Sequence, residues 1–211
     1  LLEAMTTGTD IAARNLARAA ELVTSFKQVA ADQASSQRRS FALHEVTNEI
    51  VLTLRPLIRR SEVSIEVQVP EDLWFDSYPG PLGQVLTNLL SNAVTHAFEG
   101  RSERRIRIEA EALASGRVGI RVADNGGGIA EDLLPRIFDP FVTTRMGRGG
   151  TGLGLHIAHN IAANVLGGRI SATSSEGRGT TFEIEIPLLA PQPQPPESGR
   201  DSTAAGVHRV P

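Results

Sequence analysis

The sequence predicts an α+β fold in which a mixed, largely antiparallel sheet carries helices on one face and follows a long α-helix. Three observations predict it. Apolar and polar residues alternate in two hairpin-like stretches, which indicates strands with one wet face. Apolar residues recur every three to four positions in two further stretches, which indicates helices. The first 40 residues carry a helical pattern alone.

The long helix is expected from Thr9 to about Arg39, where neither proline nor glycine occurs. Its apolar residues recur at alternating steps of four and three, as in a coiled coil. A helix with one apolar stripe has to bury it, so we expect a helical bundle. A surface helix of a single globular domain is the alternative. The stripe consists of Ala12, Leu16, Ala19, Val23, Phe26 and Ala30.

Strands and shorter helices follow. Residues 64–69 alternate up to Pro70 and predict a strand, while residues 106–122 and 170–186 predict hairpins. One helix is expected to begin near Pro79, and its apolar face consists of Leu82, Leu86, Leu89, Ala93 and Ala97. A second helix is expected over residues 152–166, before Gly167-Gly168.

Composition limits the kinds of partner. A formal net charge of -3 on 211 residues, with 21% charged residues, gives no field that would attract nucleic acid or an anionic membrane. The absence of cysteine excludes disulfides, thiolate metal sites and thiol catalysis, and is compatible with a cytoplasmic location. No apolar run reaches the roughly 18 residues of a membrane span.

The stretch QVLTNLLSNAVTHAF places Asn88 and Asn92 one helical turn apart, opposite the leucine face. Gln84 lies one turn earlier, and Thr95 and His96 lie one turn later. Stacked carboxamides can offer oxygen atoms to a hard cation such as Mg²⁺. A solvated polar face is the alternative.

The stretch VADNGGGI ends a predicted strand with Asp124 and continues into three glycines, Gly126 to Gly128. Glycine backbone can adopt positive φ and approach a flat ligand closely. A carboxylate at the strand end can accept a hydrogen bond from an exocyclic amine such as that of adenine. A simple glycine-rich turn is the alternative.

Two further stretches are adjacent in the chain. RIFDPFVTTRMGRGG offers aromatic, hydroxyl and cationic side chains among glycines, and could fold over a triphosphate as a lid or be a structural loop. GRGGTGLGLHIAHN crowds glycines at the mouth of a helix, where free backbone N–H groups suit an anion. It matches neither the P-loop nor the dinucleotide turn. The side chains of the first stretch are Phe138, Phe141, Thr143, Thr144, Arg145 and Arg148.

Taken in order, these stretches resemble the catalytic, ATP-binding domain of sensor histidine kinases. NLLSNAVTHA matches the N box, DNGGGI the G1 box, IFDPFVTT the F box and GGTGLGL the G2 box. The resemblance covers roughly Phe41 to Pro187 and implies a Bergerat-type ATP-binding sandwich. It also implies three segments: the second helix of a dimerisation and phosphotransfer bundle over 1–40, the catalytic domain over 41–189, and a proline-rich tail, expected to be disordered, over 190–211.

The resemblance implies roles for individual residues. Asn92 and Asn88 face Mg²⁺ and the phosphates, Asp124 binds the adenine amino group, and Arg145 reaches the terminal phosphate, so that Asn88 and Arg145 are the catalytic candidates. Gly126 and Gly128 shape the adenine pocket. The other expected ATP contacts are His96, which packs on adenine, and Phe138, Phe141, Thr144, Arg148, Gly150, Thr151, Gly152, Leu153 and Gly154. His156 and His159 are expected to be packing or surface residues.

Gyrase-like ATPases of the same superfamily have a water-activating glutamate where this chain has Asn88. Without that carboxylate no general base for hydrolysis is evident, which favours phosphoryl transfer to a protein nucleophile. The partners implied by the resemblance are ATP with Mg²⁺, a response regulator receiver domain, and a second copy through the helical bundle. The alternatives are a non-catalytic nucleotide-binding or dimerisation module, and a serine kinase of the anti-sigma type.

His44, in FALHEVTNEI, has the local sequence of a phosphate-accepting histidine, because Glu45 follows it directly. Its position contradicts that role. It follows the long helix instead of preceding it, and fewer than 20 residues separate it from the strand expected at Ser64. We therefore expect His44 in the first helix of the ATP-binding domain, and the acceptor upstream of Leu1. We also expect the chain to bind Mg·ATP without phosphorylating itself.

Overall fold

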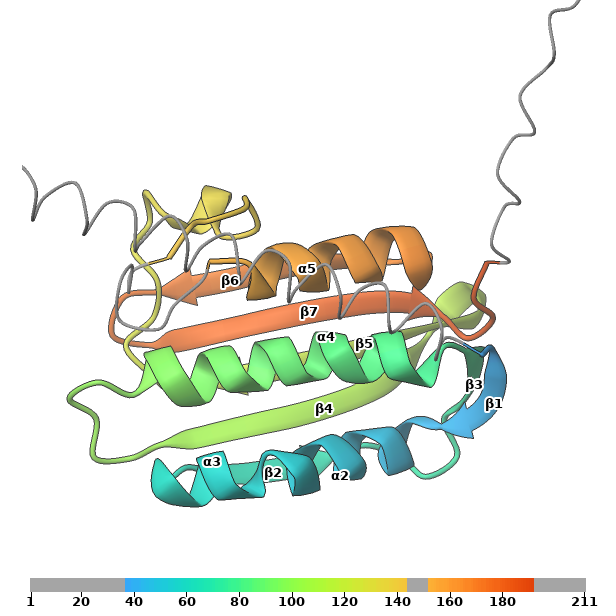
Figure 1. Ribbon diagram of the computed structural model, residues 1–211, viewed down its shortest axis with the longest axis horizontal. Coiled ribbons are helices and arrows are strands. Elements are labelled where there is room, and N and C mark those ends of the chain that lie inside the picture. Colours follow the sequence, from blue (N-terminus) through green and yellow to red (C-terminus); the bar gives the residue numbers. More distant parts are fainter. Residues whose placement is uncertain (1–36, 144–151, 192–211) are drawn as a thin grey trace, which may run out of the picture.

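Five strands form one mixed sheet with the order β2-β4-β5-β7-β6 (Figure 1). β2 pairs parallel with β4, and the other three pairs are antiparallel. This computed structural model describes residues 37–143 and 152–191. The predicted strand and both predicted hairpins are confirmed, as β2 (Ser64–Gln68), β4 (Arg105–Leu113), β5 (Arg117–Asp124), β6 (Arg169–Ser175) and β7 (Gly179–Pro187).

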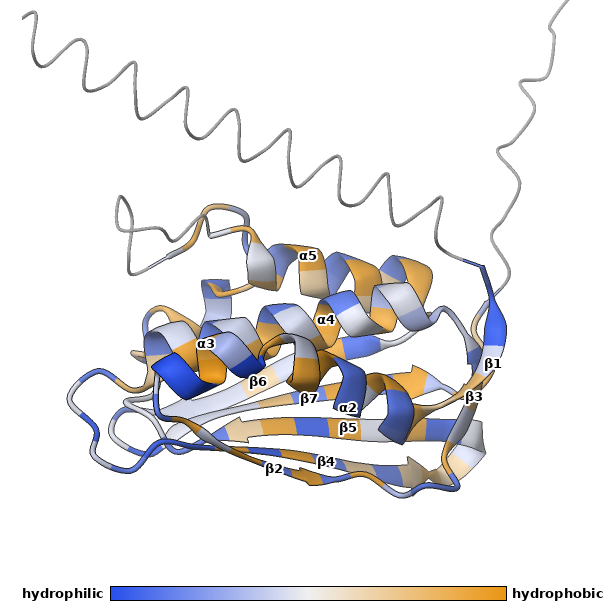
Figure 2. Ribbon diagram, turned by 60° about the horizontal axis from the view of Figure 1, so that its bottom comes forward, coloured by the Kyte–Doolittle hydropathy of each residue, from blue (hydrophilic) through white to orange (hydrophobic). Residues whose placement is uncertain are grey.

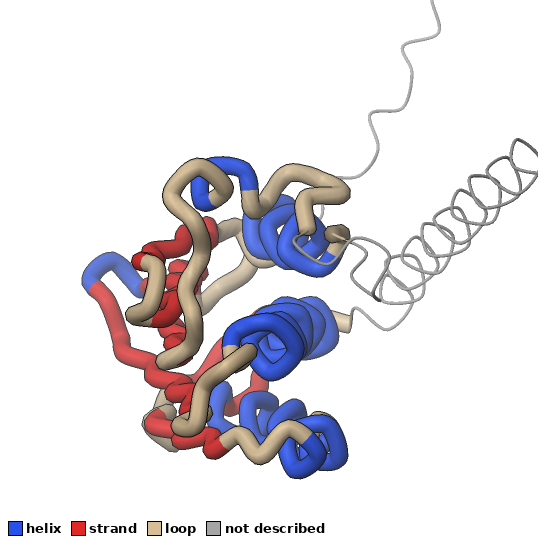
Figure 3. Tube along the Cα trace, turned by 90° about the vertical axis from the view of Figure 1, so that its left-hand side faces the viewer, coloured by secondary structure: helices blue, strands red, loops and turns tan. Residues whose placement is uncertain are grey.

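Helices cover one face of this sheet as a second layer (Figure 3). The central helix of that layer contacts helices on both sides. It begins with proline in its first turn, where the missing N–H has no helical partner to lose. The predicted layer is thus confirmed. Its members are α2 (Leu43–Thr53), α3 (Arg55–Arg60), the central α4 (Pro79–Asn92) with the π-helical turn η1 (Ala93–Ala97), and α5 (Gly154–Asn160) with the π-helical turn η4 (Ile161–Val165).

The core lies between the two layers. Ile108 on β4 pairs with Val122 on β5, and Ile120 pairs with Ile184 on β7, so that one face of three neighbouring strands is apolar. Figure 2 shows apolar residues, in orange, recurring along the helices and on the strands. Burying one leucine side chain contributes roughly 1.5–3 kcal/mol. In α4 this applies to the four fully buried leucines, Leu82, Leu86, Leu89 and Leu90.

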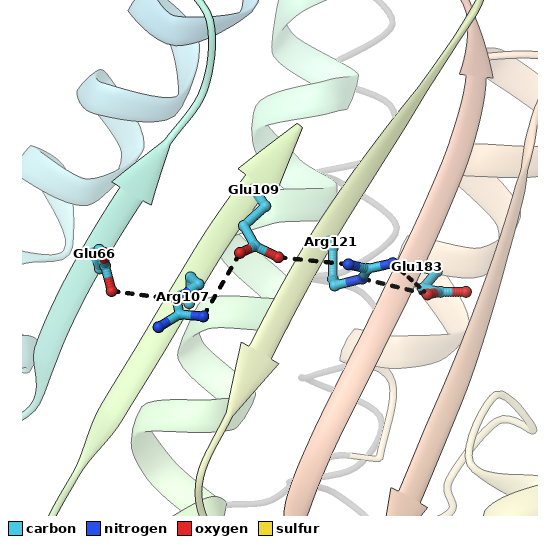
Figure 4. A network of polar contacts seen from close by, with 5 residues as sticks. All are labelled: Glu66, Arg107, Glu109, Arg121 and Glu183. Atoms are coloured by element: carbon cyan, nitrogen blue, oxygen red, sulfur yellow. Dashed lines mark hydrogen bonds and ion pairs between the residues drawn. The ribbon is translucent and has the colours of Figure 1, made fainter. Parts of the chain in front are cut away.

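The opposite face of the sheet carries a row of ion pairs (Figure 4). Arg107 bonds to Glu66 and Glu109, and Arg121 bonds to Glu109 and Glu183, at 3.2–3.7 Å. These side chains are about one third to one half exposed. Pairs of this kind contribute at most about 1 kcal/mol each. The row therefore identifies the solvated face of the sheet, opposite the helices.

A small junction was not predicted. β1 (Arg39–Ala42) and β3 (Trp74–Ser77) form a separate antiparallel pair. Arg39 thus lies in a strand and not in the long helix, whose expected residues 1–36 are outside the described part. Ala190 is buried and its N–H donates to the Asp76 carbonyl, so it packs with this junction, while the domain bounds 41–189 stay a prediction. The expected disordered segment from 192 onward lies outside the described residues.

Candidate functional site

A cavity of about 380 Å³ lies between α4, the end of β5 and the start of α5. Of the predicted site residues in the described part, seven line it: Asn88, Asn92, His96, Asp124, Gly128, Gly152 and Gly154. Thr143 also lines it, whereas Gly126, Phe138, Phe141 and Leu153 do not. Five predicted residues lie outside the described part: Thr144, Arg145, Arg148, Gly150 and Thr151.

The polar face of α4 forms one wall. The Gln84 side-chain amide donates to Asn88 Oδ1 at 3.2 Å, because the two residues are one helical turn apart. The Asn88 side-chain nitrogen is buried and has no hydrogen-bond partner among the described residues. A buried amide without a partner costs about 1–3 kcal/mol. Asn88 is therefore arranged to meet a polar ligand in the cavity.

Asp124 lies at the opposite wall, where β5 ends. Its Oδ1 accepts hydrogen bonds from the main-chain N–H groups of Gly126 at 2.9 Å and Thr180 at 3.3 Å. Burial raises the pKa of the Asp124 carboxyl, and these two hydrogen bonds oppose that shift only in part. No described residue donates to Oδ2. Asp124 can therefore accept a hydrogen bond from a ligand donor.

Two glycines after Asp124 allow backbone contacts that a side chain would block. A Cβ on Gly126 would meet the Ala97 carbonyl oxygen at 2.3 Å, and a Cβ on Gly128 would meet the Ser175 carbonyl oxygen at 2.1 Å. Gly128 also has a φ of +76°, which side-chain-bearing residues rarely adopt. Gly126 thus supports the cavity from behind, and Gly128 forms part of its wall.

A hydroxyl network behind Asp124 was missed in the sequence. Ser174 Oγ accepts the Ile129 N–H at 2.8 Å, donates to the Gly179 carbonyl at 2.9 Å, and lies 3.0 Å from Thr180 Oγ1. It therefore ties the β6–β7 turn to the loop after Asp124. Alternation identified β6 and β7 as strands, but nothing in that pattern indicates which loop their turn would contact.

The apolar wall was also missed. Its side chains come from the loop after Gly128, the start of α5 and β7, and none stands out locally from an ordinary core residue. They are Ile129, Leu133, Ile137, Val142, Leu155 and Phe182. A pocket with apolar walls and a few converging polar groups fits a flat, partly polar ligand such as a nucleotide base.

Phe138 and Phe141 behave differently from each other. The Phe138 ring packs between the rings of His159 and Phe182, with centroid distances of 5.4 and 6.4 Å. Phe141 is 41% exposed, has a φ of +66°, and donates its N–H to the Gly152 carbonyl at 2.9 Å. Phe138 thus stands one layer behind the cavity wall.

The carboxamides of Asn88 and Asn92 could hold the expected magnesium ion only if a bound nucleotide supplied further oxygen atoms. Asn88 and Asn92 are the carboxamides on the α4 wall, and Mg²⁺ accepts such oxygens while keeping waters and phosphate oxygens. Among the described residues, no three His, Cys, Asp or Glu side chains gather as a metal site. His44 lies on α2 and is not a lining residue.

Comparison with known proteins agrees with this geometry. Residues 78–190, more than half of the chain, match the family model HATPase_c, histidine kinase-, DNA gyrase B-, and HSP90-like ATPase. The sensor histidine kinase RcsC of Escherichia coli (strain K12) is 35% identical over 178 residues, which are 81% of this chain and 18% of RcsC. The chain thus spans about a fifth of that relative's length.

Solved structures show the same fold. The catalytic domain of histidine kinase ThkA superposes with a TM-score of 0.63 and 31% identity, covering 72% of this chain and 97% of that domain. ThkA in complex with the response regulator protein TrrA superposes with a TM-score of 0.60 and 27% identity, covering 81% of this chain and 49% of ThkA. In the described part of the present chain, no helix is long and apolar enough to cross a membrane.

Proposed function

We propose a function from one premise: this chain belongs to the family of histidine kinase-, DNA gyrase B-, and HSP90-like ATPases and carries the ATP-binding catalytic domain of a sensor histidine kinase. Its cavity holds Mg·ATP for transfer of the γ-phosphoryl group to a histidine. Adenine lies at the Asp124 wall. The phosphates lie toward Asn88, Asn92 and the start of α5.

One observation carries the position of adenine. Asp124 Oδ1 is occupied by two backbone N–H groups, and Oδ2 receives no hydrogen bond from a described residue. Adenine presents an exocyclic amine that donates, while its flat ring suits the apolar wall around Ile137 and Phe182. His96, which also lines the cavity, supplies a second flat surface for the base.

The position of the phosphates follows from the two carboxamide side chains on the α4 wall. Asn88 and Asn92 would hold Mg²⁺ through side-chain oxygen, and the metal would neutralise phosphate charge and orient the γ-phosphoryl group. Because Asn88 Oδ1 now accepts from the Gln84 amide, the Asn88 and Gln84 amides would both turn, so that Asn88 Oδ1 faces the metal and Asn88 Nδ2 donates to Gln84 Oε1. Arg145, outside the described residues, remains a predicted contact to the terminal phosphate.

The chemistry favours transfer over hydrolysis. Among the described residues that line the cavity, Asp124 carries the sole carboxylate, and its pKa is set by burial at the adenine wall and not beside the phosphates. A water-activating base is therefore absent from the α4 wall, where Asn88 stands. The acceptor is a histidine of a phosphotransfer helix, and a response regulator receiver domain takes the phosphoryl group from it, as the ThkA complex with TrrA supports. A second copy of the chain, joined through the expected helical bundle, is part of the proposal.

Calorimetric titration with the non-hydrolysable ATP analogue AMP-PNP tests this function. Wild-type chain is expected to bind one equivalent with Mg²⁺ present, and absence of binding would favour the scaffold alternative. Incubation with γ-labelled ATP then tests the acceptor. No acid-labile label is expected on this chain, and label that disappears in a His44→Gln variant would identify His44 as the acceptor after all.

A further inference from the structure

We infer that His156 is a positioning residue that fixes the apolar wall of the nucleotide cavity through the main-chain carbonyl of Phe138. The inference rests on the proposed ATP site and adds to it a residue of α5 that does not line the cavity. The ring nitrogen Nδ1 of His156 lies 2.9 Å from the Phe138 carbonyl oxygen, 18 positions earlier in the chain.

The loop that supplies this wall is weakly tied by its own backbone. In the described part of the segment from Leu134 to Thr143, four backbone hydrogen bonds of turns and loops are made by the N–H groups of Leu134, Arg136, Asp139 and Phe141, and none of them belongs to a strand ladder. Ile137, which is 4% exposed, and Val142 and Thr143 nevertheless line the cavity. Something besides a strand ladder therefore has to set the position of Ile137.

The hydrogen bond to His156 provides this tie next to Ile137. A carbonyl oxygen can only accept, so His156 donates from a protonated Nδ1. Nε2 is then an acceptor, and the Asn160 side-chain nitrogen lies 3.0 Å from it, one helical turn along α5. The two contacts together fit the tautomer of His156 that carries its proton on Nδ1.

Ring packing supports the same segment from the side. The Phe138 ring lies between His159 of α5 and Phe182 of β7, and Phe182 itself lines the cavity. His156 and His159, three positions apart on α5, thus both contact Phe138: His156 binds its carbonyl, and His159 packs on its ring. A shift of Phe138 would move Ile137 and Phe182, the surfaces on which we place the base.

A matched pair of variants separates the hydrogen bond from general packing. In His156→Asn the amide nitrogen is bonded to Cγ, as Nδ1 is in histidine, so it can still donate to the Phe138 carbonyl. In His156→Gln the amide nitrogen is one bond farther out, toward the Nε2 position. AMP-PNP affinity with Mg²⁺ is expected within about twofold of wild type in His156→Asn and about two- to tenfold weaker in His156→Gln.

Two readouts decide the outcome. Two-bond ¹H–¹⁵N correlation spectra of the imidazoles should show His156 as the Nδ1–H tautomer, and an Nε2–H tautomer would overturn the inference. Equal affinity of both variants and wild type would also overturn it, while leaving the ATP site intact. Failure of the wild-type chain to bind AMP-PNP would instead refute the proposed function. If His156→Gln does not fold, the tautomer of the wild-type chain still decides.

Discussion

The Asp124 carboxylate and the Thr180 main-chain amide are hydrogen-bonded at 3.3 Å, although 56 positions separate the two residues. This contact joins the end of β5 to the start of β7, where Asp124 and Thr180 are paired in the sheet. It occupies Oδ1 together with the Gly126 amide, so that Oδ2 is the oxygen a ligand can reach. The sheet register therefore determines how this carboxylate can bind a base.

Asp124→Asn is expected to weaken AMP-PNP binding by about 5- to 150-fold. If the amide keeps its oxygen toward the backbone donors of Gly126 and Thr180, its nitrogen faces the adenine amine, and two donors then meet. Calorimetric titration measures the change. Inosine triphosphate, which carries an acceptor in place of the amine, should lose less affinity than the ATP analogue, and equal losses for both nucleotides would contradict this placement of the base.

The same variant should not lower the stability of the ligand-free protein at neutral pH. Burial raises the folded-state pKa of Asp124, so the carboxyl favours folding when protonated, and this contribution is lost as pH rises through the folded pKa. Asparagine carries no charge at any of these pH values. Thermal melts at pH 7 should therefore give a Tm equal to or above that of wild type, and a clear decrease would show that the ionised carboxylate stabilises the fold.

Asn92→Ala is expected to remove most of the Mg²⁺ dependence of nucleotide binding. Asn92 is half-buried at the cavity wall and supplies one of the two proposed carboxamide ligands. AMP-PNP affinity is measured once with Mg²⁺ and once with EDTA. The ratio of these two affinities should be at least about tenfold smaller in the variant than in wild type.

Asn164→Ala is the matched control, because Asn164 is exposed on η4 and does not line the cavity. It should retain the wild-type response to Mg²⁺. An unchanged response in Asn92→Ala would exclude Asn92 as a metal ligand.

Gly128→Ala is expected to destabilise the protein by about 1–3 kcal/mol or more, because its φ is +76° and the added Cβ would meet the Ser175 carbonyl at 2.1 Å. Gly80→Ala serves as the comparison. Apart from the adjoining residues and the backbone of α4, no heavy atom lies within 4 Å of a Cβ there, so a change of less than about 1 kcal/mol is expected. Urea unfolding of both variants measures the difference, and similar values for the two would contradict the contact.

Asp76→Asn tests the junction formed by β1 and β3. Arg38 hydrogen-bonds both Asp76 oxygens, at 2.8 and 3.1 Å, and holds the pKa of Asp76 below its usual range. A lowered folded-state pKa stabilises the fold above the unfolded-state pKa, near 3.9, and this contribution disappears as pH falls through the folded value.

Melting curves of Asp76→Asn should therefore lie below wild type at pH 7 and approach it in acid below about pH 4. The exposed Asp72 in the preceding turn supplies the control substitution Asp72→Asn. A difference in Tm between wild type and Asp76→Asn that stays constant across this pH range would mean that the ion pair with Arg38 does not cause the loss of stability.

Much of this molecule could be predicted from local pattern. Alternation located β4 and β5 around Ser115, and the apolar face of α4 identified its buried leucines, because each depends on neighbours within a few residues. The same local reasoning placed Asn88, Asn92 and Asp124 as ligand-facing residues, and all three line the cavity. The position of His44 in a helix of the ATP-binding domain was predicted by counting residues, and it lies in α2.

What local pattern could not give depends on contacts distant in the chain. β1 and β3 are too short to show alternation, and they pair across more than 30 positions. Ala190 is buried, and its N–H donates to the Asp76 carbonyl, 114 positions earlier in the chain. Local pattern was sufficient to locate the main strands and helices and the side chains that we propose as contacts of Mg·ATP. Tertiary structure alone decided that Thr180 directs Asp124 and that His156 holds Phe138, because hydrogen bonds between distant segments form only once the sheet and α5 are packed together.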